Sequence, residues 1–216
     1  MDGYRTLKGY GEQEIVIKKS RFISCAKPIT EESEAVTFIQ EIRKRFPDAS
    51  HHCYAYIIGK NSGIMRYSDD GEPSGTAGIP MLEVLKMRQI VDAVVVVTRY
   101  FGGTLLGAGG LVRAYTQGCS EGINKAEVVM MEKSLTMTIQ VPYFLWDKTQ
   151  YEMGRQPVQV LETDYSEEVL ATFLIREKDL STFEKALTNW SEGKLTARPV
   201  KEGYQAWSVA EEPVNP

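Results

Sequence analysis

The sequence predicts an α+β protein of two domains, residues 1–130 and 131–216. The run AVVVV at 93–97 is too continuously apolar for a half-exposed strand, so it indicates a strand at the centre of a sheet. After residue 130 the pattern starts again with clean alternation of apolar and polar residues. From there the order βαββαβ fits into roughly 80 residues, which is the ferredoxin-like arrangement. A chain of 216 residues is long enough for two domains that each bury a core.

The first domain mixes strand and helix signals. Thr30 is expected to cap a helix that Pro47 ends, because apolar residues between them recur at near-helical spacing. The other elements expected here are a strand in the first part of 14–29, a hairpin of 51–59 and 64–68, a helix over 79–87, a central strand over 91–101 and a helix over 109–124.

The second domain carries shorter elements. Residues 135–141 alternate as a half-buried strand, and Asp179 is expected to cap a helix that contains Phe183 and Trp190. The other elements expected here are a helix over 144–154 and strands over 157–162, 167–175 and 194–200.

Composition favours an ordinary globular protein of the cytoplasm. The start of the chain has no signal-peptide pattern, no apolar run suits a membrane helix, and three scattered cysteines suggest neither disulfides nor a zinc site. Residues 1–130 hold 16 Lys and Arg against 15 Asp and Glu, whereas the remainder holds 9 against 14. A basic patch is therefore expected only in the first domain, which weakens a general nucleic-acid-binding interpretation. No membrane partner and no DNA sequence specificity are expected.

The stretch TRYFGGTLLGAGGLVRAYTQG at 98–118 is the main candidate site. It is not a Walker A loop, because Ala108 stands where the lysine belongs, and Val112 replaces the third glycine of a dinucleotide fingerprint. A strand, a flexible turn and a helix start with free amides remain, which can hold an anion, while the glycines equally suit positive φ and close packing. The candidate anion- or partner-binding residues are Arg99, Tyr100, Phe101, Gly102, Gly103, Gly107, Gly109, Gly110 and Arg113.

The turn SDDGEPSGTAGIP at 68–80 is the second concentrated stretch. Asp69, Asp70 and Glu72 have the oxygen ligands of a cation site or of acid–base chemistry, but the spacing does not match an EF-hand loop. Turn formation by Asp-Gly and Glu-Pro is the favoured interpretation. An acidic surface for a basic partner is the functional role that we expect in addition.

The two histidines, His51 and His52, point to opposite faces of a strand and cannot form one site. His51 shares a face with Cys53, which indicates core packing rather than a nucleophile pair. His52, Tyr54 and Tyr56 form a face that suits base stacking or protein docking, and covering by the second domain explains it equally well. We predict no catalytic residue, metal site or cofactor, and an enzyme is the less favoured class.

Several motifs resemble the IMPACT family, a family of uncharacterised proteins found in bacteria and eukaryotes. They are KSRF (19–22), HHCYAY (51–56), DDGEPSGTAG (69–78) and the long run 78–115 with its core from Arg99 to Gly107. The resemblance implies a first domain of the β-α-β type shared with RNase PH, certain ribosomal proteins and small-molecule kinases. The second domain is similar to the ferredoxin-like domains of elongation factor G. Kinase activity is not implied, because the glycine run here is Gly-Ala-Gly-Gly-Leu.

The resemblance also implies a link to translation. Eukaryotic members regulate translation by competing for the activator of a stress-responsive kinase, through a further N-terminal domain that we expect this chain to lack. The favoured hypothesis is a cytosolic, non-enzymatic protein that binds the ribosome, a translation factor or structured RNA. The alternatives are an enzyme acting on a phosphorylated or nucleotide-like small molecule, and a protein–protein regulator without an anion site.

Overall fold

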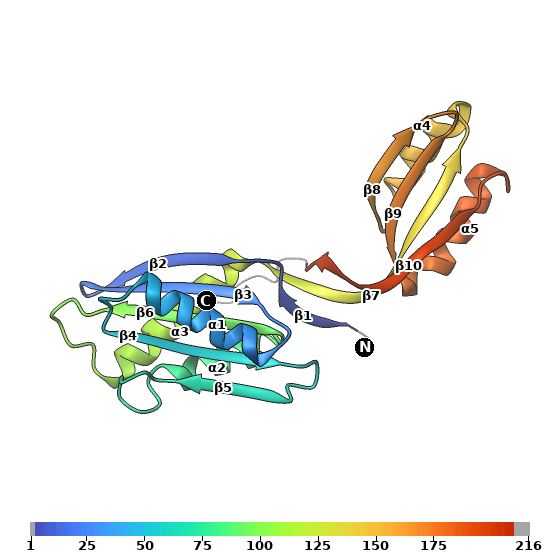
Figure 1. The fold of residues 1–216 in the computed structure, drawn as a ribbon. Helices are drawn as coiled ribbons and strands as arrows, with labels where there is room; N and C mark the ends of the chain where they lie inside the picture. The colour runs from blue at the N-terminus through green and yellow to red at the C-terminus, as the bar shows by residue number, and fades with distance from the viewer. Residues whose placement is uncertain (1–2, 210–216) are drawn as a thin grey trace. The chain divides into compact units, whose positions relative to one another are not determined.

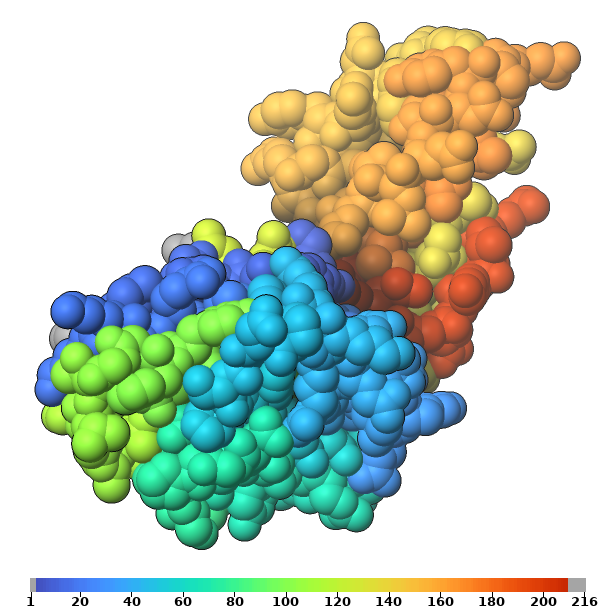
Figure 2. Space-filling model, turned by 60° about the vertical axis from the view of Figure 1, so that its left-hand side comes forward, coloured from blue at the N-terminus to red at the C-terminus, as the bar shows by residue number. Residues whose placement is uncertain are grey.

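The computed structural model describes residues 3–209, which divide into two compact units. The first contains Tyr4–Met130 and, of the described C-terminal residues, 206–209; the second contains Gly3 and Met131–Gln205. In the space-filling view the blue-to-green residues gather in the first unit and the yellow-to-orange residues in the second (Figure 2). The predicted α+β architecture with two units is confirmed.

The first unit is a sheet with helices on both faces (Figure 1). Its elements are β1 (Tyr4–Leu7), β2 (Gly11–Ile17), β3 (Ser20–Pro28), α1 (Glu32–Arg45), β4 (His51–Ile58), β5 (Ile64–Ser68), α2 (Gly78–Met87), β6 (Ala93–Tyr100) and α3 (Ala108–Ala126). The sheet order is β2-β3-β6-β4-β5, and all its neighbours are antiparallel. The continuously apolar strand β6 is third of five, as its sequence predicts.

Alternation along β6 supplies two cores. Val95 and Val97 pack with α2 and α3 on one face, whereas Val94 and Val96 pack with α1 on the other. All four side chains are fully buried. Because Arg99 continues the Val95–Val97 side of the strand, its side chain lies under α3 rather than under α1.

The predicted cap of α1 is wrong by one residue. Glu31, not Thr30, occupies the N-cap and forms a capping box with Glu34. The Glu34 carboxylate also accepts the Thr30 amide, so Thr30 takes part in the same helix start without capping it. The helix ends at Arg45, two residues before Pro47.

The second unit contains one sheet and two helices. Its elements are α4 (Tyr143–Met153), β8 (Val158–Tyr165), β9 (Val169–Arg176), a 3₁₀ turn (Glu177–Asp179), α5 (Leu180–Ser191) and most of β7 (Val128–Val141) and β10 (Ala197–Ser208). The first three residues of β7 and the last three of β10 belong to the first unit. Strands follow the order β8-β9-β7, and β7 also pairs with β10 and with β1. Its core includes Phe173, Phe183 and Trp190. Asp179 lies at the N-cap of α5, but its carboxylate bonds Arg176 instead of the helix amides.

None of the helices formed by residues 3–209 has both the length and the apolar character needed to cross a membrane.

Candidate functional site

The loop between β5 and α2 is folded around the Asp69 carboxylate. Its two oxygens accept the backbone N–H groups of Gly75, Ala77 and Gly78 at 2.8–3.0 Å. Burial alone raises the pKa of this carboxyl, but the three N–H donors outweigh it and lower the pKa below the ordinary value. Since Ala77, the N-cap of α2, has no side chain that can cap the helix, Asp69 satisfies these donors in its place.

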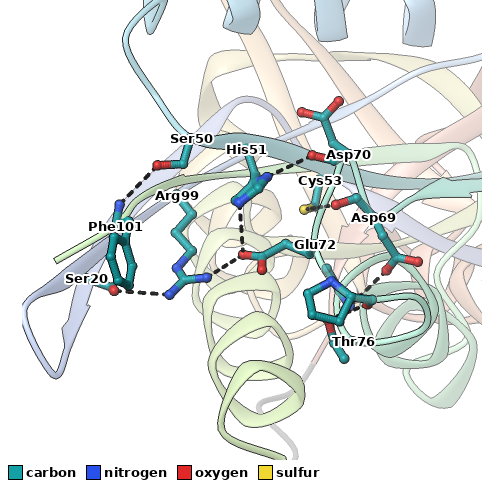
Figure 3. A network of polar contacts seen from close by, with 12 residues as sticks. Ser20, Ser50, His51, Cys53, Asp69, Asp70, Glu72, Thr76, Arg99 and Phe101 are labelled. Atoms are coloured by element: carbon teal, nitrogen blue, oxygen red, sulfur yellow. Dashed lines mark hydrogen bonds and ion pairs between the residues drawn. The ribbon is translucent and has the colours of Figure 1, made fainter. Parts of the chain in front are cut away.

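Glu72 forms a buried ion pair with Arg99 (Figure 3). The Glu72 Oε1 atom lies 2.6 Å from Arg99 Nη1 and accepts the Tyr115 hydroxyl at 2.8 Å. Both charged side chains are almost fully buried, with 3% and 6% of their surface exposed. Burial strongly raises the pKa of the Tyr115 hydroxyl, so this group stays a neutral donor. The contact joins the 69–78 loop, the central strand and α3.

The rest of the Arg99 guanidinium meets aromatic rings and one serine. Nη2 donates to Ser20 Oγ at 3.3 Å, and the guanidinium carbon lies 5.4 Å from the Phe22 ring and 5.6 Å from the Phe101 ring. Its Nε is buried and has no hydrogen-bond partner among the described residues. Arg99 therefore lies in the interior and does not present a cation to solvent.

His51 lies beside this pair and is partly exposed. Its Nδ1 is 2.8 Å from the Asp70 carbonyl oxygen, which can only accept, so Nδ1 carries a proton. Its Nε2 is 3.9 Å from Glu72 Oε1. The neighbouring Cys53 thiol donates to the Asp69 carbonyl oxygen at 3.0 Å, and burial raises its pKa to about 12. Cys53 is therefore a packed thiol, not an activated nucleophile.

The three acidic residues of the turn do not form a common surface. Asp69 binds backbone amides, and Asp70 pairs with Arg43 at 2.5 Å and accepts the His52 amide at 2.6 Å. Glu72 points into the interior toward Arg99. The expected acidic surface is therefore wrong for Glu72, because its charge is neutralised and buried.

The face with His52, Tyr54 and Tyr56 is covered by α1. His52 and Tyr56 are 7% and 4% exposed, and Tyr54 is half-buried with its ring stacked 6.1 Å from that of Tyr56. The His52 Nε2 donates to the Phe46 carbonyl at 3.0 Å. This face packs within the first unit, so neither base stacking nor the second unit is needed to explain its apolar character.

The side chains of Tyr100 and Phe101 have different surroundings. Tyr100 packs with the α1-side core, with the Arg21 guanidinium 5.2 Å from its ring. Phe101 is half-exposed at the start of the glycine loop, where its amide donates to Ser50 Oγ.

Three of the five loop glycines, Gly102, Gly103 and Gly107, are needed by the chain's own geometry, and Gly110 is tightly packed. A Cβ on Gly102 would come within 2.1 Å of the Lys19 carbonyl carbon, and one on Gly110 within 3.1 Å of Leu106. Gly103 and Gly107 have φ of +80° and +71°, which disfavour other residues. Gly109 is the exception: its φ is ordinary, and a Cβ there would meet nothing within 4 Å.

The start of α3 is exposed and uncapped. Gly107 has no side chain to cap the helix, and the first intrahelical bond runs from Leu111 N–H to the Gly107 carbonyl. The preceding amides, of residues 108–110, have no partner among the described residues, and the first turn carries no acidic residue. Arg113 lies further along the helix with an exposed side chain.

Two lysines that are not among the site residues expected from the sequence lie beside the loop. Lys18 and Lys19 form the exposed turn between β2 and β3, which contacts Gly102 closely. Ser20 and Tyr115 were missed as well: Ser20 Oγ accepts the Gly102 amide, and the Tyr115 hydroxyl bonds Glu72. The helical spacing places Tyr115 in the core, and the need of a buried hydroxyl for a partner is the signal that points to a polar network there.

Across residues 3–209, no group of three or more His, Cys, Asp or Glu side chains is arranged to hold a metal ion. Of the three acidic residues of the turn, Glu72 is the one that contacts Arg99 and Tyr115, and these two residues already occupy its Oε1.

Sequence and structure comparisons identify relatives along most of the chain. Residues 18–123 match the family described as Impact N-terminal domain, and residues 139–194 match a domain of unknown function, DUF1949. IMPACT family member YvyE of Bacillus subtilis is 45% identical over 203 residues, covering 94% of this chain and 92% of that protein. An IMPACT family member of Haemophilus influenzae is 34% identical, covering 87% and 92%.

A crystal structure of a hypothetical protein has the same fold along nearly the whole chain. It is 31% identical, with a TM-score of 0.59, and the match covers 98% of this chain and 100% of the other. Together with the identity to YvyE across both units, these matches show that the chain belongs to the IMPACT family.

Proposed function

We propose that this chain is a cytoplasmic, non-enzymatic binding protein linked to translation. Its site is the glycine-rich loop at 102–110 with the start of α3, and its ligand is phosphate-bearing: structured RNA, alone or within the ribosome. Family membership supports the link, because eukaryotic members regulate translation. In fold terms, we propose that residues 1–130 are the RNase PH-like domain and residues 131–216 the ferredoxin-like domain. The order β8-β9-β7, with β10 pairing with β7, supports the second assignment, although β7 also pairs with β1.

The observation that carries the proposal is Gly109. Its missing side chain relieves no strain and no clash within the chain. A glycine at the second position of a helix exposes the backbone amides to whatever approaches from solvent. Phosphate oxygens are the usual ligands of such amides, because the helix dipole and the free N–H groups both favour negative charge.

Cations around the loop support an anionic ligand. Lys18, Lys19 and Arg113 are exposed, and none has an ion-pair partner among the described residues. Arg21, by contrast, is held by Glu14 at 2.8 Å. Since Arg99 is buried against Glu72, the loop's positive charge toward solvent comes from these three residues and from the helix start. Unpaired cations beside free amides suit a phosphate backbone.

The buried contacts of Glu72 favour a structural role for the acidic turn over a catalytic one. A general acid or base has to reach the substrate, whereas 3% of the Glu72 side chain is exposed and its charge is neutralised. The Cys53 thiol is held in its protonated form by burial. This arrangement favours a binding protein over an enzyme.

RNA binding measured across a salt series tests the proposal. A fluorescent structured RNA is titrated with the wild-type chain and with Arg113→Ala, and ribosome co-sedimentation is run in parallel. Loss of one phosphate contact is expected to lower the salt slope of log K by about 1. Lys125→Ala is the matched control, because Lys125 is an exposed cation at the other end of the same helix.

Three outcomes contradict the proposal. Absence of RNA and ribosome binding at low salt removes it. Equal loss of RNA affinity in Arg113→Ala and Lys125→Ala would show general electrostatic attraction to RNA without a specific site at the loop. Capture of a protein partner that is insensitive to both variants and to salt would favour the protein–protein regulator without an anion site.

A further inference from the structure

β8 lies at one end of the sheet in the second unit, and one of its two edges pairs with no other described strand. β8 pairs with β9, and no other strand among residues 3–209 pairs with it. The outward N–H and C=O groups of such an edge are a template for another extended chain. Most of its eight residues are exposed.

The pairing register fixes which way the side chains of β8 point. Val160 lies opposite Phe173, and Tyr165 lies opposite Val169, and both partners are buried in the core under the helices. Glu162 and Asp164 lie opposite Thr172 and Leu170, on the other face of the sheet. The edge therefore offers apolar groups on its helix side and carboxylates on its open side.

Three apolar side chains on the helix side of β8 are more than half exposed. Val160, Leu161 and Tyr165 are 53%, 57% and 59% exposed. Leu161 is the extra residue at the irregularity between Val160 and Glu162, so it has no partner on β9. A strand that buries these side chains gains apolar contact that β9 alone does not supply.

The N-terminal turn of α4 extends this apolar side. The Tyr143 hydroxyl donates to the Ser166 carbonyl at 2.7 Å, and the Trp146 ring lies 6.2 Å from that of Tyr165, edge to face. Tyr143 and Phe144 are 52% and 80% exposed. The α4 and β8 residues lie at the surface in yellow to light orange (Figure 2). Exposed tyrosines and phenylalanines of this kind are typical of protein-binding surfaces.

The charge at this edge is of one sign. Residues 158–168 contain Glu162, Asp164, Glu167 and Glu168 and no Lys or Arg. All four carboxylates are exposed, and none has a cationic partner among the described residues. Pairing with β8 of a second copy would bring acidic rows together, which is destabilising. The charge therefore selects a basic partner.

We infer that β8 binds an extended segment of another protein in which apolar and basic residues alternate. The segment adds a strand along Glu162–Tyr165. Its basic side chains lie over Glu162 and Asp164 on the open face, and its apolar side chains lie over Leu161, Tyr165 and Tyr143. Backbone hydrogen bonds give affinity, and the two-residue alternation gives specificity. This site belongs to the second unit and goes beyond the proposed function.

Peptide binding to the full chain tests the inference. The probe is a fluorescent ten-residue peptide of alternating valine and lysine, compared with one of alternating valine and glutamate. Glu162→Lys is expected to weaken binding of the lysine peptide roughly fivefold, because an attractive cross-strand pair becomes repulsive. Glu184→Lys is the matched control, with the same charge change on an exposed residue of α5.

N-methylation of the peptide distinguishes strand addition from simple charge attraction. Methyl groups on every second amide remove either the donors that face β8 or those that face solvent. One of the two patterns is expected to abolish binding, and the shifted pattern to leave it intact. Arg113→Ala in α3 is expected to leave peptide affinity unchanged. A failure of peptide binding can therefore be distinguished from a failure of RNA binding at the glycine loop.

Three results overturn the inference. One is equal weakening by Glu162→Lys and Glu184→Lys. Another is binding that neither methylation pattern affects. The third is a concentration-dependent dimer in sedimentation velocity that Glu162→Lys abolishes, which would make a second copy the occupant of the edge.

Discussion

The Glu72 carboxylate and the Arg99 guanidinium form an ion pair at 2.6 Å inside the first unit. One partner comes from the loop before α2 and the other from the central strand, 27 residues further on. Because Tyr115 of α3 bonds the same carboxylate oxygen, the pair holds three elements together. The two most distinctive motifs of the sequence thus meet in one buried contact.

Removal of either charge is expected to destabilise the first unit strongly. Arg99→Met or Glu72→Gln leaves an uncompensated buried charge, which costs about 3–5 kcal/mol. The double variant is expected to cost less than the sum of the two, since neither charge remains. Hydrogen exchange in β4 and β6 measures this locally, and additive effects would mean that the two residues stabilise the fold independently.

Asp69→Asn is expected to destabilise the loop and to change its acid sensitivity. The variant loses charge-assisted bonds to amides at the start of α2, a loss of roughly 2 kcal/mol. In the wild type the folded pKa is lowered, so the stabilisation is present above the ordinary value of 3.8 and is lost as pH falls through the folded pKa. Urea denaturation at pH 7 and pH 3 checks this. A wild-type pH dependence identical to that of the variant would exclude Asp69 as its source.

His52 is expected to make the first unit sensitive to mild acid. Burial lowers its folded pKa below the ordinary 6.5. Its contribution to stability is therefore present above that value and is lost as pH falls through the folded pKa. NMR titration of the imidazole measures the shift directly. In His52→Gln, the decline in unfolding free energy just below pH 6.5 is expected to be smaller; an unchanged decline would assign it to other groups.

Gly102→Ala is expected to disrupt the contact between the glycine loop and the β2–β3 turn. The added methyl would lie 2.1 Å from the Lys19 carbonyl carbon, so backbone must move, at a cost of about 1–3 kcal/mol. Gly9→Ala is the control, because a Cβ there meets nothing within 4 Å. Thermal unfolding distinguishes them, and a neutral Gly102→Ala would show that the turn yields easily.

The helices and strands can be predicted from local sequence patterns, whereas the buried contacts among Glu72, Arg99 and Tyr115 cannot. The apolar run of β6 and the spacing of α3 place Val95 and Tyr115 in the core from sequence alone. Glu72 is different: a charged residue in a Gly- and Pro-rich turn is expected at the surface, and its burial depends on Arg99 and Tyr115, which only tertiary structure brings near. Likewise, Ser20 lies 79 residues from Arg99.

The glycines of the 102–110 loop show the same limit of prediction from sequence. Their number predicts a special loop, but not which of them the chain itself requires. The close approach of Lys19 to Gly102 depends on how the β2–β3 turn lies against the loop, and the open space at Gly109 likewise appears only in the folded chain. The sequence locates the candidate site, and the structure separates the glycines that the backbone requires from Gly109, which it does not require.

The pair of measurements on Gly109→Ala tests the central claim most directly. Alanine fits this position and favours the helix, so the free energy of unfolding is expected to rise by about 0.5–1 kcal/mol. In the same protein, affinity for structured RNA is expected to fall, because the methyl group blocks approach of a phosphate to the amides at the start of α3. A more stable variant with weaker RNA binding is the predicted result. A more stable variant with unchanged RNA binding would contradict a ligand at this loop.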